Sequence, residues 1–127
     1  MKILLVDDSK VIRLLVGTYL KENGHSVTEA EDGQAALAIL KKTPKEFELV
    51  ITDLNMPFKT GLELLDDMGE DETLKKVPAV LYSTDSNSWL VSQITSKGIF
   101  YADKGKGIAD IEKALSSIAA GLKPPTT

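Results

Sequence analysis

The chain is 127 residues long, with 43% hydrophobic and 27% charged residues, which is a single-domain length and an ordinary globular mixture. This composition excludes intrinsic disorder, and the absence of cysteine excludes disulfides, thiolate metal sites and thiol nucleophiles. A net charge of −4 with only 15 lysines and arginines leaves no broad basic surface, so direct nucleic-acid binding is not expected. No apolar run reaches the length of a transmembrane helix or of a signal-peptide core, and we expect a cytoplasmic protein without membrane contact.

Apolar runs and helical patterns alternate from the start of the chain. The run at 3–6 is continuously apolar, which is typical of a parallel strand covered on both faces. Ser9 can then cap a helix, and Asn23 and Gly24 supply its end. The predicted inward face of this helix consists of Ile12, Leu15, Val16 and Tyr19.

The alternation repeats along the rest of the sequence. Further strands are predicted at 25–30, 49–51, 79–82 and 99–102. Their helices are predicted after Asp32-Gly33, after a loop with Pro57 and Gly61, around Trp89, and from Ile108 to a stop at Gly121. The acidic stretch at 70–72 is interpreted as a solvated connection. The last helix is the most clearly amphipathic, and its apolar stripe is predicted to include Leu122.

Five strands alternating with five helices across short loops predict a parallel sheet with helices on both faces, because right-handed crossovers permit little else. We therefore expect a doubly wound, three-layer α/β domain over residues 1–122, with residues 123–127 as a frayed end or the start of a linker. In such sheets the reactive site lies outside the carboxyl ends of the strands, near the point where the strand order reverses.

Chemically active side chains follow four of the predicted strands. These residues are Asp7 and Asp8, Asp53, Ser83 and Thr84, and Lys104. Three converging carboxylates stay charged only beside a cation, either a metal or a lysine. An oxygen-only cluster suits a hard ion, and Mg²⁺ commonly takes one or two carboxylates while keeping waters and phosphate oxygens. An aspartate, a metal, a lysine and a hydroxyl together suffice for phosphoryl transfer to an aspartate.

These residues also resemble the receiver domains of response regulators in two-component signalling, over essentially the whole chain. The matching motifs are Asp7-Asp8, the run Asp53-Leu54-Asn55-Met56-Pro57 followed by Gly61, Ser83, and Tyr101-Ala102-Asp103-Lys104. The resemblance implies a flavodoxin-like, CheY-like fold and a single-domain phosphoacceptor. It also implies a histidine kinase or phosphotransfer protein as phosphodonor and a protein partner that reads the phosphorylated state.

The same resemblance implies a role for each matching residue. Asp53 would be the phosphoacceptor, in a site holding Mg²⁺ or Mn²⁺. The metal ligands would be Asp8, Asp53 and the Asn55 backbone carbonyl, with Asp7 acting through water. Ser83 would bind a phosphoryl oxygen, Lys104 would pair with the phosphoryl group, and Tyr101 would change rotamer when Ser83 moves. Asn55 and Asp85 occupy positions that tune phosphate lifetime, and the face formed by the fourth helix, fifth strand and fifth helix would bind the partner.

The sequence departs from the family pattern near the fifth strand. Gly105 stands where a proline is common after the lysine, and the stretch before Tyr101 looks one residue short. A glycine is expected to take a trans bond here, which leaves the path of the loop to Gly107 open. Lys106 is the alternative to Lys104, although the spacing from Tyr101 favours Lys104.

Other functions compete with the phosphoacceptor hypothesis. A degenerate receiver could act as a phosphorylation-independent scaffold. A haloacid-dehalogenase-type phosphatase would place its two first-strand aspartates two residues apart, whereas here they are adjacent. A flavin binder would need a hydroxyl- and glycine-rich phosphate loop instead of Asp7-Asp8. We therefore expect a signalling protein that promotes only its own phosphorylation and dephosphorylation.

Trp89 and His25 are interpreted as structural residues without a part in the site. Trp89 is interpreted as a partly buried helix residue in preference to a binding hot spot. His25 has no second metal-ligand type beside it and is interpreted as an exposed turn residue.

Overall fold

The fold is organised around one sheet of five parallel strands in the order β2-β1-β3-β4-β5. We describe residues 1–125 of a computed structural model. The strands are β1 (Lys2–Val6), β2 (Ser26–Ala30), β3 (Leu49–Thr52), β4 (Ala79–Ser83) and β5 (Phe100–Asp103). The predicted doubly wound α/β fold is therefore confirmed.

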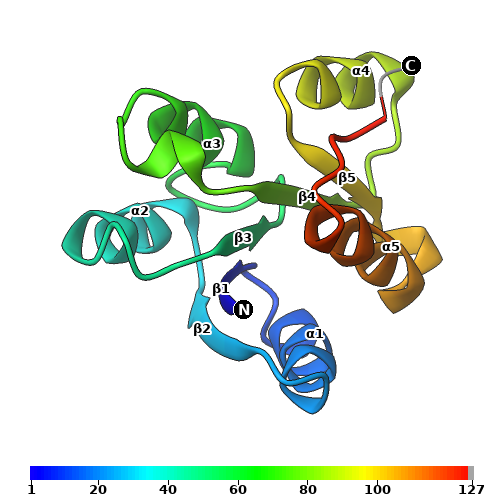
Figure 1. Cartoon of the computed structure of the whole chain (residues 1–127), viewed down its shortest axis with the longest axis horizontal. Helices are drawn as coiled ribbons and strands as arrows, with labels where there is room; N and C mark the ends of the chain where they lie inside the picture. The colour runs from blue at the N-terminus through cyan, green and yellow to red at the C-terminus, as the bar shows by residue number, and fades with distance from the viewer. Residues whose placement is uncertain (126–127) are drawn as a thin grey trace.

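Helices cover both faces of the sheet (Figure 1). The helices are α1 (Lys10–Glu22), α2 (Gly33–Lys42), α3 (Gly61–Gly69), α4 (Ser88–Ser96) and α5 (Ile108–Ala119), with short turns η1 (Leu74–Lys76) and η2 (Lys104–Lys106). Within residues 1–125, none of the helices has the length and apolar character needed to cross a bilayer.

Side-chain caps account for the start of four of these helices. Ser9 accepts a hydrogen bond from the Ile12 amide, and Asp32 accepts one from the Ala35 amide. Thr60 forms a capping box with Glu63 at the start of α3, and Asn87 caps α4. The helix starts expected at Ser9 and at Asp32-Gly33 are thus confirmed.

The core is divided in two by the sheet. One cluster joins β1, β3 and β4 to α2, α3 and α4, with Leu40, Leu64 and Ile94 fully or almost fully buried. The other joins the opposite face of the same strands to α1 and α5, through Val16, Leu20 and Ile111. Because both faces are covered, β1, β3 and β4 are apolar apart from Lys2, Thr52 and Ser83 at their ends and the Tyr82 hydroxyl.

Two side chains predicted on inward helix faces, and a third interpreted as partly buried, are exposed instead. Leu15 is 54% exposed, since the inward face of α1 is centred on its neighbour Val16. Leu122 is 61% exposed, because α5 ends at Ala119 and Gly121 turns the chain away. The interpretation of Trp89 as partly buried is wrong. Trp89 lies in the first turn of α4 and is 71% exposed.

The interpretations of His25 and of the acidic stretch at 70–72 also need correction. His25 is partly buried, and its Nδ1 lies 2.9 Å from the N-terminal amine. Burial is the first cause, and the nearby terminal charge the second, of its pKa lying below the ordinary histidine value. The acidic stretch at 70–72 is more than a solvated connection, because Asp71 accepts hydrogen bonds from the amides of Thr73 and Leu74 at the start of η1.

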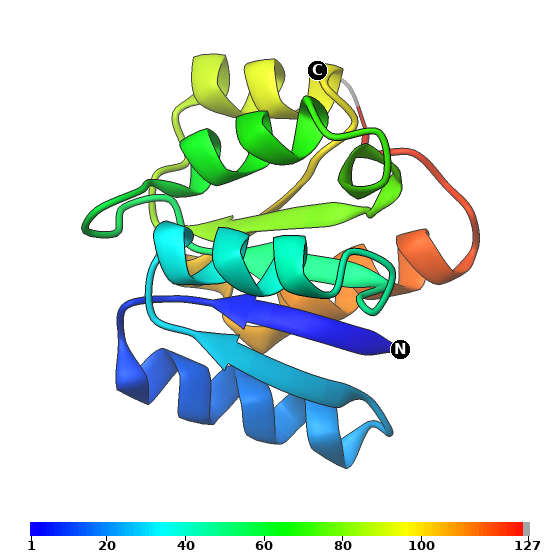
Figure 2. The same cartoon turned by 90° about the vertical axis from the view of Figure 1, so that its left-hand side faces the viewer.

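The predicted tail at 123–127 lies only partly within the described residues. Residues 126–127 fall outside them, and within the described part Pro124 is buried. The carboxyl ends of all five strands point to one edge of the molecule (Figure 2). The strand order reverses between β1 and β3 at that edge, which is where a ligand site is expected in such a sheet.

Candidate functional site

The register of the sheet brings Asp7 and Asp53 side by side. Val6 pairs with Thr52 across β1 and β3, so the residue that follows each strand meets the other at the carboxyl edge. The Asp53 amide donates to the Val6 carbonyl at 2.8 Å and fixes this register beyond the strand end. Two residues 46 positions apart therefore share one pocket.

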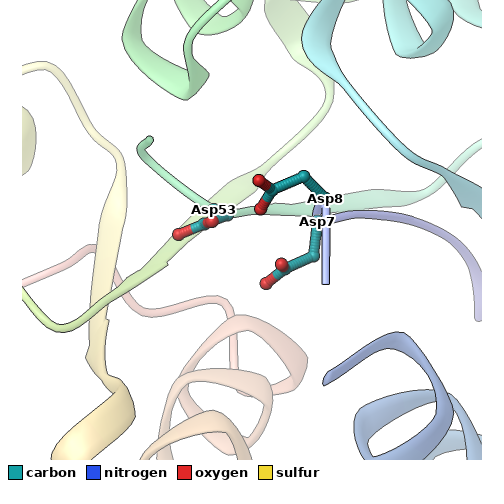
Figure 3. Close-up of side chains that lie close together, drawn as sticks. All are labelled: Asp7, Asp8 and Asp53. Carbon is teal, nitrogen blue, oxygen red and sulfur yellow. The ribbon is translucent and has the colours of Figure 1, made fainter. Parts of the chain in front are cut away.

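Three carboxyl groups converge in this pocket (Figure 3). Oxygens of Asp7, Asp8 and Asp53 lie within 4.8 Å of one another. Asp7 and Asp53 are buried, whereas Asp8 is exposed and opens the cluster to solvent. Like charges at this spacing repel, and the all-oxygen donor set suits a hard divalent cation such as Mg²⁺.

Lys104 supplies the positive charge of the pocket. Its Nζ lies 2.9 Å from Asp7 Oδ2 and 3.0 Å from Asp53 Oδ1. Burial alone would lower the pKa of Lys104, but its contacts with Asp7 and Asp53 outweigh burial and raise the pKa. The ammonium also lies 5.6 Å from the centre of the Tyr82 ring. Lys104 is therefore held charged beside the cluster.

Lys104 reaches the pocket although Gly105 replaces a proline. No peptide bond in residues 1–125 is cis, as expected for this glycine. The Asp103 side chain accepts a hydrogen bond from the Gly105 amide at 2.8 Å and starts the η2 turn. Lys106 lies elsewhere, along a groove between α4 and α5. Of the two lysines considered, Lys104 is the one in contact with the carboxylates.

Asp53 is held in an environment that disfavours its charge. Burial is the main cause of its raised pKa, and repulsion from Asp7 adds to it. The Lys104 contact and the Leu54 amide, which donates to Asp53 Oδ1 at 2.9 Å, act in the opposite direction. Among the described residues, none donates a hydrogen bond to Asp53 Oδ2. That oxygen is the one open to chemistry.

Ser83 and Tyr101 are linked through the segment that follows β4. Ser83 is buried, and its Oγ accepts a hydrogen bond from the Asp85 amide at 3.0 Å. The Tyr101 hydroxyl donates to the carbonyls of Asp85 at 2.8 Å and Ser83 at 3.2 Å. Burial is the first cause of a Tyr101 pKa of about 12, so this hydroxyl keeps its proton at neutral pH. Movement of Ser83 therefore requires these contacts to change.

The loop between β3 and α3 approaches the Asp53 backbone closely. The Gly61 amide donates to the Leu54 carbonyl at 2.9 Å. A Cβ on Gly61 would lie 2.0 Å from the Asp53 carbonyl oxygen, so a side chain cannot fit here. The side chain of Asn55, within this loop, is exposed, as is that of Asp85 on the β4–α4 segment.

Arg13 is a neighbour of the site that the sequence pattern did not identify. Its guanidinium donates to the Asp7 carbonyl at 2.6 Å and to Glu29 at 3.1 Å. The only sequence signal is its place on α1, four residues after the Ser9 cap. Its partner Glu29 comes from β2, which only the fold brings near. Arg13 therefore helps to fix the peptide that carries Asp7.

Comparison with known proteins agrees with this geometry. A family model described as the response regulator receiver domain matches residues 3–115. Chemotaxis protein CheY-3 of Vibrio cholerae is 37% identical over 100 residues, which cover 78% of this chain and 75% of that protein.

Solved structures give the same result. The chemotaxis response regulator CheY4 of Vibrio cholerae is 30% identical with a TM-score of 0.82, covering 92% of this chain and 97% of that one. TrrA of Thermotoga maritima, solved in complex with Mg²⁺-BeF, is 29% identical with a TM-score of 0.76, covering 91% of this chain and 96% of that one.

Proposed function

The chain belongs to the response regulator receiver domains, which act as phosphoacceptors in signalling, and we propose that Asp53 is the residue that accepts the phosphoryl group. The observation that carries this assignment is the position of Asp53. It lies at the reversal of strand order, buried between Lys104 at 3.0 Å and the carboxylates of Asp7 and Asp8.

The chemistry follows from the free oxygen of Asp53. Oδ2 attacks the phosphorus of a phosphohistidine, the new P–O bond forms, and the P–N bond breaks with its electron pair returning to the imidazole. Oδ1 stays bound to the Leu54 amide and near Lys104, which holds the carboxylate in one orientation. The Lys104 ammonium would then shift toward the phosphoryl oxygens as their charge arrives.

A divalent ion, Mg²⁺ or Mn²⁺, fits the residues around Asp53. The proposed ligands are Asp8, Asp53 and the Asn55 carbonyl, with Asp7 holding a metal-bound water. When bound, the ion would neutralise charge on the phosphoryl oxygens. The presence of Mg²⁺-BeF in the related TrrA supports this choice of cofactor.

Ser83 and Tyr101 are proposed to form the conformational switch. Ser83 would exchange its Asp85 amide contact for a hydrogen bond to the phosphoryl group. That exchange displaces the carbonyls that now accept from the Tyr101 hydroxyl, and the ring can turn into the space Ser83 leaves. Phosphorylation would change the charge in the buried pocket, and the switch would pass this change on to the surface around α4, β5 and α5.

Asn55 and Asp85 are proposed to set how long the phosphoryl group persists. Both side chains are exposed and follow the site residues Asp53 and Ser83 by two positions. From these positions they would control the access of water to the acyl phosphate. The chain would thereby promote its own phosphorylation and dephosphorylation, as a signalling protein without a separate substrate.

Receiver domains take phosphoryl groups from histidine kinases and signal to downstream partners. For this chain, we propose a histidine kinase or a phosphotransfer protein as donor and the α4–β5–α5 face as the surface read by a partner protein. The cytoplasm is the proposed location, where such donors present their phosphohistidine.

The direct test is intact-mass spectrometry after incubation with acetyl phosphate, with and without Mg²⁺. We expect one phosphoryl adduct that needs Mg²⁺, is cleaved by hydroxylamine, and is lost in Asp53→Asn. Asp66→Asn is the matched control, because Asp66 is an exposed carboxylate of α3 that pairs with Lys97. Its adduct should equal that of the wild type.

Two results would count against the assignment. An adduct that persists in Asp53→Asn would move the phosphoryl group to another residue. No adduct, together with no binding of beryllofluoride, would favour the phosphorylation-independent scaffold.

A further inference from the structure

A groove between α4 and α5 is bordered by the chain's own carboxyl-terminal segment, at Pro125. The groove has a volume of about 390 Å³. Its walls include Val91 and Thr95 of α4, Tyr101 of β5, Ala114 and Ser117 of α5, and Pro125. Residues from three elements of the proposed output face thus line one groove together with a proline that lies beyond α5.

The segment that carries this proline is directed back onto the face by the end of α5. Gly121 has a φ of 73°, and the Leu122 amide donates to the Ser117 carbonyl at 2.9 Å. The chain then runs from α5 toward α4 (Figures 1 and 2). Pro124 is buried, although Lys123 and Pro125 on either side are exposed. Burial of one residue between two exposed ones indicates a specific contact of the segment with the domain.

The chemistry of the groove suits a proline pair. Proline has a fixed φ and no amide hydrogen, so it can be buried without leaving a donor unpaired and with little loss of chain entropy. Phe100 and Tyr101 line the groove, and aromatic walls are the common setting for extended proline segments. The charged lining residues are balanced, with Asp103 and Asp110 against Lys106 and Lys113, so net charge does not select the occupant.

We propose that the α4–α5 groove binds an extended proline-containing segment, and that residues 123–125, which reach its border at Pro125, are its intramolecular ligand. This inference rests on the proposed function of the α4–β5–α5 face. A partner protein that reads this face must displace the segment before it can contact Tyr101 and α4. The segment therefore competes with the partner and sets a threshold for signalling.

The first test compares amide chemical shifts of the unphosphorylated protein with those of a chain truncated after Leu122, which keeps the hydrogen bond that caps α5. We expect shifts at Val91, Thr95 and Tyr101, far from the truncation in sequence. In the 127-residue chain, Pro124→Ser should reproduce these shifts, whereas the matched Lys123→Ser should not. Unchanged groove amides in both the truncated chain and Pro124→Ser would overturn the proposal.

The second test adds a peptide of residues 119–127, AAGLKPPTT, to each chain and follows the same amides. The truncated chain should bind it. The 127-residue chain should bind it about threefold more weakly or worse, because its attached segment competes at a millimolar effective concentration. The peptide AAGLKSSTT is the control and should not bind. Equal affinity of the two chains for AAGLKPPTT, or no binding to the truncated chain, would contradict intramolecular occupancy.

Neither test uses Mg²⁺ or a phosphodonor, and both can be repeated on Asp53→Asn. If Asp53 is not the phosphoacceptor, the amide chemical-shift differences caused by the truncation should still be seen. If the truncation causes no such differences while Asp53 is still phosphorylated, only the proposal of an intramolecular ligand is refuted.

Discussion

Replacing Asp53 by asparagine should stabilise the metal-free protein while removing its proposed chemistry. Asparagine keeps the shape of the side chain and an oxygen for the Leu54 amide, which donates at 2.9 Å. It removes one of three negative charges that lie within 4.8 Å of one another. The variant therefore isolates the electrostatic cost of the site.

The charges around Asp53 determine how much Asp53→Asn should stabilise the metal-free protein. At an effective dielectric constant of about 20, the contact with Lys104 at 3.0 Å is worth roughly 5 to 6 kcal/mol of attraction. Repulsion across 4.8 Å is roughly 3.5 kcal/mol from each of Asp7 and Asp8. Repulsion exceeds attraction even before burial is counted, and solvent weakens the share of the exposed Asp8. We expect Asp53→Asn to gain about 1 kcal/mol in the free energy of unfolding.

Urea unfolding in EDTA at neutral pH measures this gain, with Asp66→Asn as the control that should stay near the wild type. Mg²⁺ at ten times its dissociation constant should then stabilise the wild type by about 1.4 kcal/mol. That corresponds to roughly 5 °C in melting temperature for a domain of this size. Asp53→Asn should gain less from Mg²⁺, because it has lost one proposed ligand.

The stability difference between Asp53→Asn and the wild type should change with pH in a defined direction. Burial and then Asp7 raise the folded pKa of Asp53, so its ionised form costs stability above that pKa. The cost disappears as the pH falls from neutral through the raised pKa, and the advantage of asparagine should be lost below the unfolded pKa of about 3.9. An Asp53→Asn protein that is no more stable than the wild type in EDTA, or whose advantage grows on acidification, would refute the reasoning.

Three further substitutions test the supports of the site by chemical denaturation and amide hydrogen exchange. Gly61→Ala should lose at least about 2 kcal/mol, because its Cβ would lie 2.0 Å from a backbone carbonyl, whereas Gly69→Ala, with nothing within 4 Å, should stay within about 1 kcal/mol of the wild type. Equal denaturation midpoints would contradict the close approach. Tyr101→Phe should cost about 1 kcal/mol and speed exchange of the amides after β4, since its hydroxyl makes two hydrogen bonds there; unchanged exchange would count against this brace. Lys104→Ala should cost roughly 2 to 4 kcal/mol without metal, because two buried carboxylates lose their partner, while Lys106→Ala should change stability by less than about 0.5 kcal/mol. Similar losses in the two lysine variants would show that the contact with the carboxylates carries little energy.

Lys104, predicted in preference to Lys106 from its spacing after Tyr101, is the lysine that contacts Asp7 and Asp53. Strand β5 continues to Asp103, so the next residue emerges at the carboxyl edge, where Asp7 and Asp53 also lie. The sequence indicated this through the spacing of Lys104 from Tyr101, which matches the receiver-domain pattern. It did not indicate how the loop after Lys104 would run without a proline. The Asp103 side chain, which accepts from the Gly105 amide, decides that path.

Exposure was less predictable than secondary structure. Helical periodicity gives the spacing of an apolar face but not its centre, so Leu15 was placed inward when Val16 is the residue at the centre. Trp89 is interpreted from the sequence as a partly buried helix residue because of its size, but Leu90 and Ile94 are the buried residues of α4 at this point and Trp89 is exposed. Which apolar residue is buried depends on the neighbouring element, and that neighbour is distant in sequence.

The sequence by itself determined the alternation of strands and helices, the parallel sheet, and the residues at each strand end, because local patterns and turn chemistry encode them. Only the tertiary structure decided which of these residues touch. The register of β1 against β3 joins Asp7 to Asp53, the fold brings Arg13 of α1 to the Asp7 peptide, and the turn after α5 returns Pro124 to a buried position. Contacts of this kind depend on how elements pack in three dimensions, which no local pattern of residues specifies.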